Sequence, residues 1–214
     1  MTTLYLVRHG ETVTNNSGIV AGAYDAKLTE IGVQQSKLVA KHFENIHLDA
    51  IYSSNISRAS IMANEIARYH KLPVHYEPRL REINLGDWEG HHVSEMEAQW
   101  PELYKVWMED QGHCTCPNGE SVLDVQDRVM KGIQAIVKEH PNQAVLCVTH
   151  GLALKTVFVA LTNASLSRFR ELQYVTNASI TTLQTDDEER INLVSYGDDS
   201  YLSRDMITHI FSKA

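Results

Sequence analysis

The sequence predicts an α/β fold in which a mostly parallel central sheet is flanked by helices. Two observations support this prediction. Short apolar runs rich in Val, Ile and Tyr alternate with segments of helical periodicity, which is typical of βαβ units. In addition, a chain of 214 residues that is 43% hydrophobic and 21% charged has the length and composition of one soluble domain with a substantial core.

Six apolar runs are expected to form strands. The last two are separated by the polar segment "TDDEER", which predicts that they form a hairpin. The expected strands are Leu4–Val7, Asp49–Ser53, Val74–Glu77, Ala144–Thr149, Ser179–Gln184 and Ile191–Ser195.

Four helices are expected around these strands. The first follows Thr29, and the second begins near Ser57. The third begins at "SVLD", where Ser121 caps the helix and Asp124 completes a capping box. The fourth, "LALKTVFVALT", follows Gly151 and is apolar nearly all round, as a helix buried against a sheet would be. The apolar residues noted on the first three are Ile31, Leu38, Val39 and Phe43; Ile61, Met62, Ile66 and Ala67; and Val122, Val125, Val129, Ile133, Ile136 and Val137.

The stretch from Arg81 to Gly119 fits this alternation poorly. Within it, "SEMEAQW" predicts a helix with a capping box at Ser94 and Glu97. Because no linker, internal repeat or low-complexity tract is visible, we expect a single domain over residues 1–214. Residues 81–119 are then an insertion that covers the edge of the sheet.

Composition excludes several classes of protein. A net charge of −8 leaves no basic stripe for sequence-independent nucleic-acid binding. No apolar run approaches the length of a membrane span, and "MTT" leads into a strand rather than a signal peptide. Three cysteines make a disulfide framework improbable and predict a reducing cytoplasm. Neither "HCTC" nor the His91-His92 pair has zinc-ligand spacing, so no metal site is expected.

Two apolar runs far apart in the sequence both end on a His-Gly pair, His9-Gly10 and His150-Gly151. Ligands of an open parallel sheet bind beyond the carboxyl ends of its strands. A glycine at such an end lets the backbone turn tightly and approach a ligand closely. If the two strands are neighbours, His9 and His150 face one pocket.

Two further charged residues follow strands. Arg58 lies in the first turn of an expected helix, where a guanidinium and free backbone N–H groups together make an anion site. Glu82 lies in a loop, within "RLREINLGDWEG". Taken singly, a surface ion pair for Arg58 and an exposed carboxylate for Glu82 remain open.

Together, Arg8, His9, Arg58, Glu82 and His150 resemble the histidine phosphatase superfamily, also called the phosphoglycerate mutase-like family. The resemblance covers most of the chain, with its motifs in the family's order, and it implies a three-layer α/β sandwich. The segments that carry it are "LVRHGET", "DAKLTEIGVQQS", "SSNISRA", "LREINLGDWEG", "NGES" and "VTHG".

The resemblance implies that His9 attacks phosphorus and carries the phosphoryl group as phosphohistidine. Glu82 would protonate the departing alkoxide and then take a proton from the attacking water. The neighbouring guanidiniums disfavour a protonated, non-nucleophilic imidazole. Neither a metal nor a cofactor is expected, because fixed cations do the work of magnesium. The residues expected to hold phosphate oxygens are Arg8, Asn15, Arg58, His150 and Gly151.

The same residues serve phosphatases and phosphoglycerate mutases. No Lys or Arg occurs between Arg81 and Lys105, and this acidic interval favours a monophosphate with an uncharged or aromatic body over the polyanion of a mutase. Ala21 stands where many of the family's small-molecule phosphatases have a glutamine; with Gly22 and Trp88 it is expected to contribute to the substrate cover.

We therefore predict a phosphatase that acts on small-molecule phosphate monoesters and releases inorganic phosphate. A mutase and a non-catalytic phospho-ligand binding module are the alternatives. Alpha-ribazole phosphate, sugar phosphates and phosphoglycerates remain open as substrates. The sequence does not reveal the oligomeric state, and a homodimer is kept only as the commonest closed assembly.

Overall fold

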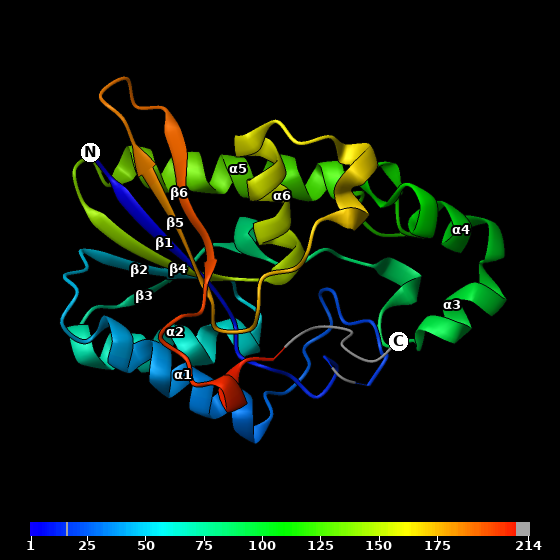
Figure 1. Ribbon diagram of the computed structural model, residues 1–214, viewed down its shortest axis with the longest axis horizontal. Helices are drawn as coiled ribbons and strands as arrows, with labels where there is room; N and C mark the ends of the chain where they lie inside the picture. Colours follow the sequence, from blue (N-terminus) through cyan, green and yellow to red (C-terminus); the bar gives the residue numbers. More distant parts are fainter. Residues whose placement is uncertain (16, 209–214) are drawn as a thin grey trace.

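The computed structural model describes residues 1–15 and 17–208 (Figure 1). Its centre is a six-stranded sheet in the order β3-β2-β4-β1-β5-β6. The first four strands pair in parallel, whereas β5 is antiparallel to β1 and forms the expected hairpin with β6. A mostly parallel sheet is thus confirmed. The strands are β1 Thr3–Arg8, β2 Ala50–Ser53, β3 Val74–Tyr76, β4 Ala144–Thr149, β5 Ile180–Thr185 and β6 Ile191–Asp198.

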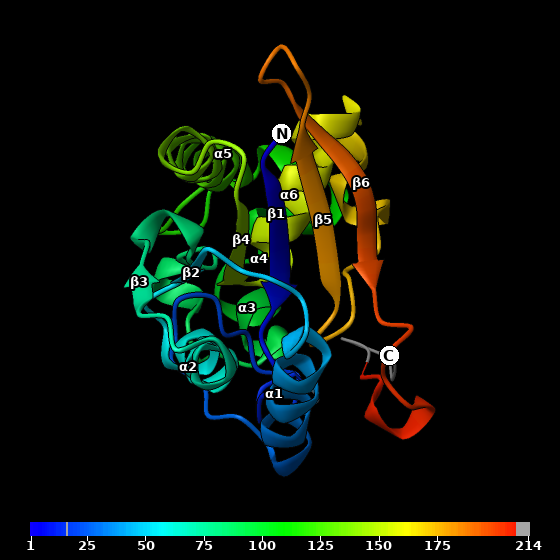
Figure 2. The same cartoon turned by 90° about the vertical axis from the view of Figure 1, so that its left-hand side faces the viewer.

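Helices cover both faces of the sheet (Figure 2). Successive residues of a strand point to opposite faces, and Leu6 and Val7 of β1 accordingly belong to two separate apolar clusters. The cluster around Val7 includes residues of α1 and α2, and the cluster around Leu6 includes residues of α5 and α6. The result is the expected three-layer α/β sandwich. The four helices are α1 Glu30–Phe43, α2 Ser57–His70, α5 Val122–Glu139 and α6 Gly151–Thr162.

The helix starts follow from local capping. Thr29 caps α1, its side chain accepting from the Gly32 N–H. Ser121 and Asp124 form the predicted capping box of α5. One predicted face is partly wrong, because Leu38 of α1 is 37% exposed while the adjacent Val39 is buried. Consecutive helical residues lie about 100° apart, and the buried face of α1 includes Val39, Ala40 and Phe43 but not Leu38.

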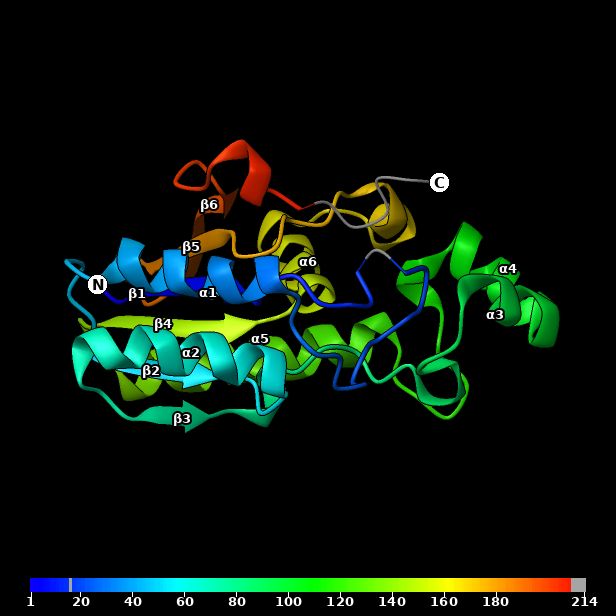
Figure 3. The same ribbon diagram turned by 90° about the horizontal axis from the view of Figure 1, so that it is seen from below.

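Residues 81–119 contain two helices, α3 Val93–Gln99 and α4 Pro101–Glu109, which lie beyond the end of the sheet (Figures 1 and 3). The predicted capping box at Ser94 and Glu97 is wrong. His92 caps α3 instead, since its ring accepts from the Ser94 N–H and the Glu95 carboxylate accepts from the His92 N–H. The helix α4 was not predicted from the sequence.

Strand register determines where the site lies. Arg8, the last residue of β1, is paired with Thr149, the last residue of β4. The residues that follow both strands therefore leave the sheet side by side. Among the described residues, no helix is long and apolar enough to cross a membrane.

Candidate active site

The two strand-terminal histidines lie next to each other. The ring centroids of His9 and His150 are 5.0 Å apart, and their planes are inclined by 57°. Gly10 follows His9 and packs directly on α1, where an added Cβ atom would lie 2.4 Å from the Gly32 carbonyl oxygen. Glycine is therefore needed for this close approach of loop and helix.

His9 is a neutral imidazole whose Nε2 carries no proton. Its Nδ1 lies 2.7 Å from the Gly10 carbonyl oxygen, which can only accept, so Nδ1 carries the proton. Nε2 accepts from Arg58 Nε at 3.2 Å. Burial, followed by the charges of Arg58 and Arg8, lowers the pKa of His9 well below its ordinary value. The lone pair of Nε2 is thus free of a proton at neutral pH.

Arg58 is a buried cation fixed by backbone carbonyls. Its guanidinium donates to the Tyr24 and Gly22 carbonyl oxygens, both at 2.7 Å, while Nε reaches His9. The loop that supplies these carbonyls is held by Glu89, whose carboxylate accepts from the Ala23 and Tyr24 N–H groups. Glu89, in the motif "GDWEG", therefore supports the guanidinium that contacts His9.

Arg8 is the second buried guanidinium whose charge acts on His9. It is 2% exposed and donates from one terminal nitrogen to the Val175 carbonyl oxygen, but its Nε has no hydrogen-bond partner among the described residues. Burial lowers the pKa of Arg8 to about 10, which still leaves it charged at neutral pH. A Cβ atom added to Gly151 would lie 3.2 Å from this Nε, so the donor faces the first residue of α6.

His150 differs from the expectation that it faces the pocket. It is completely buried and does not line the cavity described below. Its Nε2 lies 2.8 Å from Ser54 Oγ, whereas its Nδ1 is buried without a partner in the described structure. Ser54 Oγ also accepts from the Ile56 N–H; in the tautomer that has the proton of His150 on Nδ1, the Ser54 hydroxyl donates to Nε2. Burial first, and then the charge of Arg58, lowers the pKa of His150 well below its ordinary value.

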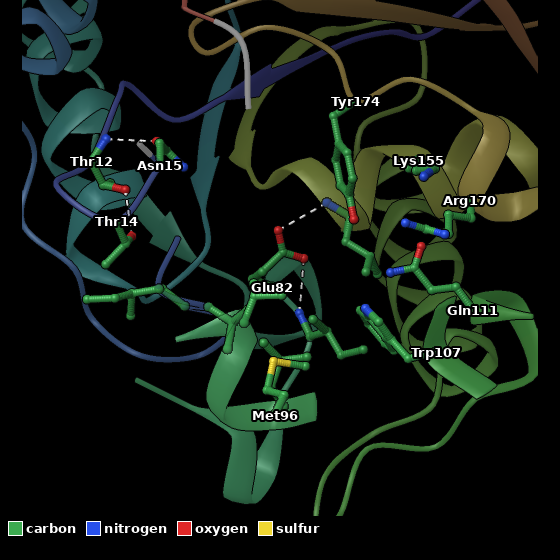
Figure 4. A pocket seen from close by; sticks show the side chains of 18 of the residues that line it. Thr12, Thr14, Asn15, Glu82, Met96, Trp107, Gln111, Lys155, Arg170 and Tyr174 are labelled. Carbon is green, nitrogen blue, oxygen red and sulfur yellow. Dashed lines mark hydrogen bonds between the residues drawn. The ribbon is translucent and has the colours of Figure 1, made fainter. Parts of the chain in front are cut away.

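Glu82 lines the cavity with a carboxylate oriented by two backbone donors (Figure 4). One oxygen accepts from the Ile83 N–H and the other from the Leu152 N–H, both at 3.0 Å. Behind it, Arg128 of α5 donates to the Arg79, Arg81 and Glu82 carbonyl oxygens and pairs with Glu120 of the "NGES" segment. The loop that carries Glu82 is therefore fixed from two sides.

The remaining predicted residues divide into two groups. Asn15, Ala21 and Gly22 line the cavity. The side-chain oxygen of Asn15 accepts from the Thr12 N–H. The carbonyl oxygen of Gly22 accepts from Arg58. Trp88 is completely buried and does not line the cavity. Its apolar ring packs edge-on against Trp107, which does line it.

The cavity in front of His9 has a volume of about 510 Å³. Sequence reasoning missed several residues on its far side, which come from α4, α6 and the segments around them. Lys155 was visible as the charged residue in an otherwise apolar helix, but the others carry no motif. The missed residues are Tyr104, Trp107, Gln111, Lys155, Arg170 and Tyr174.

The cysteines and histidines set aside in the sequence have local roles. Cys114, Cys116 and Cys147 are free and buried. His113 pairs with Asp110, and His91 lies 3.5 Å from Glu95. In the part of the chain that the structure describes, no group of three or more His, Cys, Asp or Glu side chains has the geometry to hold a metal ion.

Residues 4–199 match the histidine phosphatase superfamily (branch 1), and the chain belongs to this family. Among its relatives, phosphoserine phosphatase 1 of Hydrogenobacter thermophilus is 36% identical over 91% of this chain and 90% of that protein. The metal-independent phosphoserine phosphatase of Arabidopsis thaliana is 32% identical over 95% of this chain and 84% of that protein.

Solved structures of similar fold agree with this assignment. Bacillus stearothermophilus YhfR superposes with a TM-score of 0.87 at 36% identity, covering 94% of this chain and 99% of that one. A phosphoserine phosphatase mutant of Entamoeba histolytica, in complex with phosphoserine, gives 0.82 at 31% identity, covering 95% and 100%.

Proposed function

We propose that this chain hydrolyses small-molecule phosphate monoesters through a phosphohistidine on His9, with Glu82 as the general acid and base. The observation that carries the proposal is a pair of buried donors without partners, Arg8 Nε and His150 Nδ1, beside the nucleophile. Buried polar groups are almost always hydrogen-bonded. A phosphoryl group bonded to His9 Nε2 would supply oxygens to both donors.

The reaction follows from the positions of the groups. In the first step, Nε2 of His9 bonds to phosphorus, the phosphorus–oxygen ester bond breaks, and the leaving oxygen takes the proton of the Glu82 carboxylic acid. In the second step, water attacks phosphorus, the phosphorus–nitrogen bond breaks, and the Glu82 carboxylate takes the proton of the water. His9 returns to its neutral form.

The developing negative charge lies among fixed positive groups. Arg8 and Arg58 are buried beside His9, and the N-terminus of the 12-residue helix α6 begins at Gly151. Such preorganised donors stabilise charge most where water is excluded. The proposed mechanism needs no metal, in agreement with the name of the Arabidopsis relative.

Relatives with both kinds of name occur, and those that cover most of this chain favour hydrolysis over phosphoryl return to a sugar acid, since the probable phosphoglycerate mutase of Yersinia pestis is 32% identical over only 72% of this chain. Both curated relatives described above are phosphoserine phosphatases. The absence of Lys and Arg between Arg81 and Lys105 removes cations from one wall of the cavity, but Lys155 and Arg170 supply two from the other wall. The uncharged substrate body expected from the sequence follows from the first wall alone, without the two cations of the other wall.

The test is steady-state and single-turnover kinetics with phosphoserine and p-nitrophenyl phosphate. His9→Asn is expected to abolish phosphate release from both, and an alkaline quench of the wild type should trap a labelled, acid-labile phosphoenzyme. Glu82→Gln is expected to slow phosphoserine hydrolysis by about 10²–10⁴-fold. In single turnover, the rate of phosphoenzyme formation from the nitrophenyl ester should fall far less, because nitrophenolate leaves without a proton.

Several results would contradict this assignment. Equal losses on both substrates in the rate at which Glu82→Gln forms the phosphoenzyme would exclude the acid role, and unchanged hydrolysis in His9→Asn would exclude the nucleophile. Activity lost on addition of a chelator would contradict a metal-free mechanism. A wild type that binds phosphate esters but releases none would be a binding module.

A further inference from the structure

The far end of the cavity contains a buried lysine with no acidic partner. Lys155 lies on α6 and is 1% exposed, yet it lines the cavity. Among the described residues, no carboxylate forms an ion pair with it. Its ammonium instead lies over two aromatic rings, 4.5 Å from the centroid of Phe169 and 4.4 Å from that of Tyr174. Cation–π contacts of this kind offset part of the cost of burying a charge.

Packing alone does not explain a charged residue at this position. The residues before and after Lys155 on α6, from Gly151 to Val157, are all buried, and most of them are apolar. An apolar side chain would fill the position without any desolvation cost. Burial, together with the charge of Arg170, lowers the pKa of Lys155 to about 8, so the ammonium remains charged at neutral pH.

A second cation faces the same space. Arg170, in the 3₁₀ turn Leu166–Glu171, lines the cavity near Gln111 (Figure 4). One terminal nitrogen donates to the Met108 carbonyl oxygen at 2.8 Å. In the described structure this guanidinium also has no ion-pair partner, whereas Arg168 in the same turn is paired with Glu171.

Tyr174 connects this end of the cavity to the phosphate end. Its ring lies against the Lys155 ammonium, and it also lies 3.1 Å from the position of a Cβ atom added to Gly151. Lys155 follows Gly151 by one helical turn, a rise of about 6 Å along the helix. The two ends are therefore separated by little more than one phenol ring.

We propose that Lys155 and Arg170 bind a carboxylate of the substrate, and that this chain therefore prefers phosphate monoesters bearing a carboxylate a few bonds from phosphorus. This inference rests on the proposed function. Neither cation has an ion-pair partner in the described structure, and Arg170 gives one terminal nitrogen to the Met108 carbonyl oxygen, which leaves both side chains with donors for a small anionic group.

Two substrates that differ by this group alone provide the test. Phosphoserine and O-phosphoethanolamine have the same phosphate ester and amine, and only phosphoserine has the carboxylate. The wild type is expected to have the higher kcat/KM for phosphoserine. In Lys155→Met and in Arg170→Gln, the ratio of the two kcat/KM values should fall about 10- to 100-fold, mainly through the KM for phosphoserine.

The matched control is Arg168→Gln, which removes a cation of the same turn whose side chain is 73% exposed. It should keep the wild-type ratio. Arg170 is exposed, so its variant tests the proposal even if Lys155→Met fails to fold. Wild-type ratios in both cavity variants, or no preference in the wild type while phosphate is still released, would overturn the subsite and leave the proposed function intact. No phosphate release from any ester would overturn both.

Discussion

Acidification is expected to destabilise the fold through two buried histidines, His9 and His150. The structure holds His9 and His150 fully buried and neutral, and burial lowers the pKa of each well below its ordinary value. In the unfolded chain, both rings bind a proton near pH 6.5. The unfolded state therefore binds more protons below that pH, and stability is lost as the pH falls.

The magnitude follows from proton linkage. At pH 5.5, one unit below the unfolded pKa, each histidine that remains neutral in the fold lowers the free energy of unfolding by about 1–2 kcal/mol. The pair contributes roughly 3 kcal/mol, which is a large share of the stability of a typical domain. Carboxylates with lowered pKa values, such as Glu120 and Asp124, lose their contribution only at lower pH.

Urea unfolding at pH 7.5 and 5.5, in buffers without phosphate, measures this loss. His9→Asn is expected to show a smaller difference between the two pH values than the wild type, by about 1–2 kcal/mol. His75→Asn, which removes an imidazole at the surface, is the matched control. If His9→Asn and the wild type lose the same stability on acidification, the assignment of His9 as a buried, neutral imidazole is wrong.

Three further predictions follow from contacts around the site. Gly10→Ala would place a Cβ atom 2.4 Å from the Gly32 carbonyl oxygen, so the free energy of unfolding should fall by about 1–3 kcal/mol in thermal unfolding. An unchanged Tm would contradict the close approach of Gly10 to α1. Arg128→Met leaves three loop carbonyls without their donor, so kcat should fall at least ~10-fold while urea unfolding shows a loss of a few kcal/mol. Glu89→Gln weakens the loop that fixes Arg58, so inorganic phosphate should inhibit less strongly; an unchanged inhibition constant would exclude this support.

The sheet could be predicted because its pattern is local. Each strand is a short apolar run bounded by polar residues, and β4 has the predicted bounds, Ala144–Thr149. The helix α4 was not predicted, although its Leu103, Tyr104 and Trp107 recur at helical spacing and pack against the core. It has only 9 residues and none of them is fully buried, so the pattern is short and lies outside the alternation of strands and helices. The cap of α3 was missed because a histidine, not the nearby serine, accepts the backbone N–H.

The positions of the motif residues could be predicted from the sequence for a different reason. His9 and His150 each follow a strand, and the parallel pairing of β1 with β4 places the ends of these strands together. The burial of His150 could not be predicted, because it depends on residues distant in sequence, such as Ser54 and His9. The same holds for Arg128, which reaches the Glu82 loop from 46 residues away.

One helix end carries groups of both proposed subsites. His150 precedes α6, the N–H of Leu152 orients Glu82, and Lys155 lies one turn beyond Gly151. Groups held by the same rigid helix keep fixed separations, whereas groups held by separate loops do not. The distance from the N-terminus of α6, which faces the proposed phosphate position, to Lys155 of the proposed carboxylate subsite is therefore determined by helical rise. It follows that the length of the substrate, measured from phosphorus to carboxylate, should be selected more strictly than the apolar body that faces Met96 and Trp107.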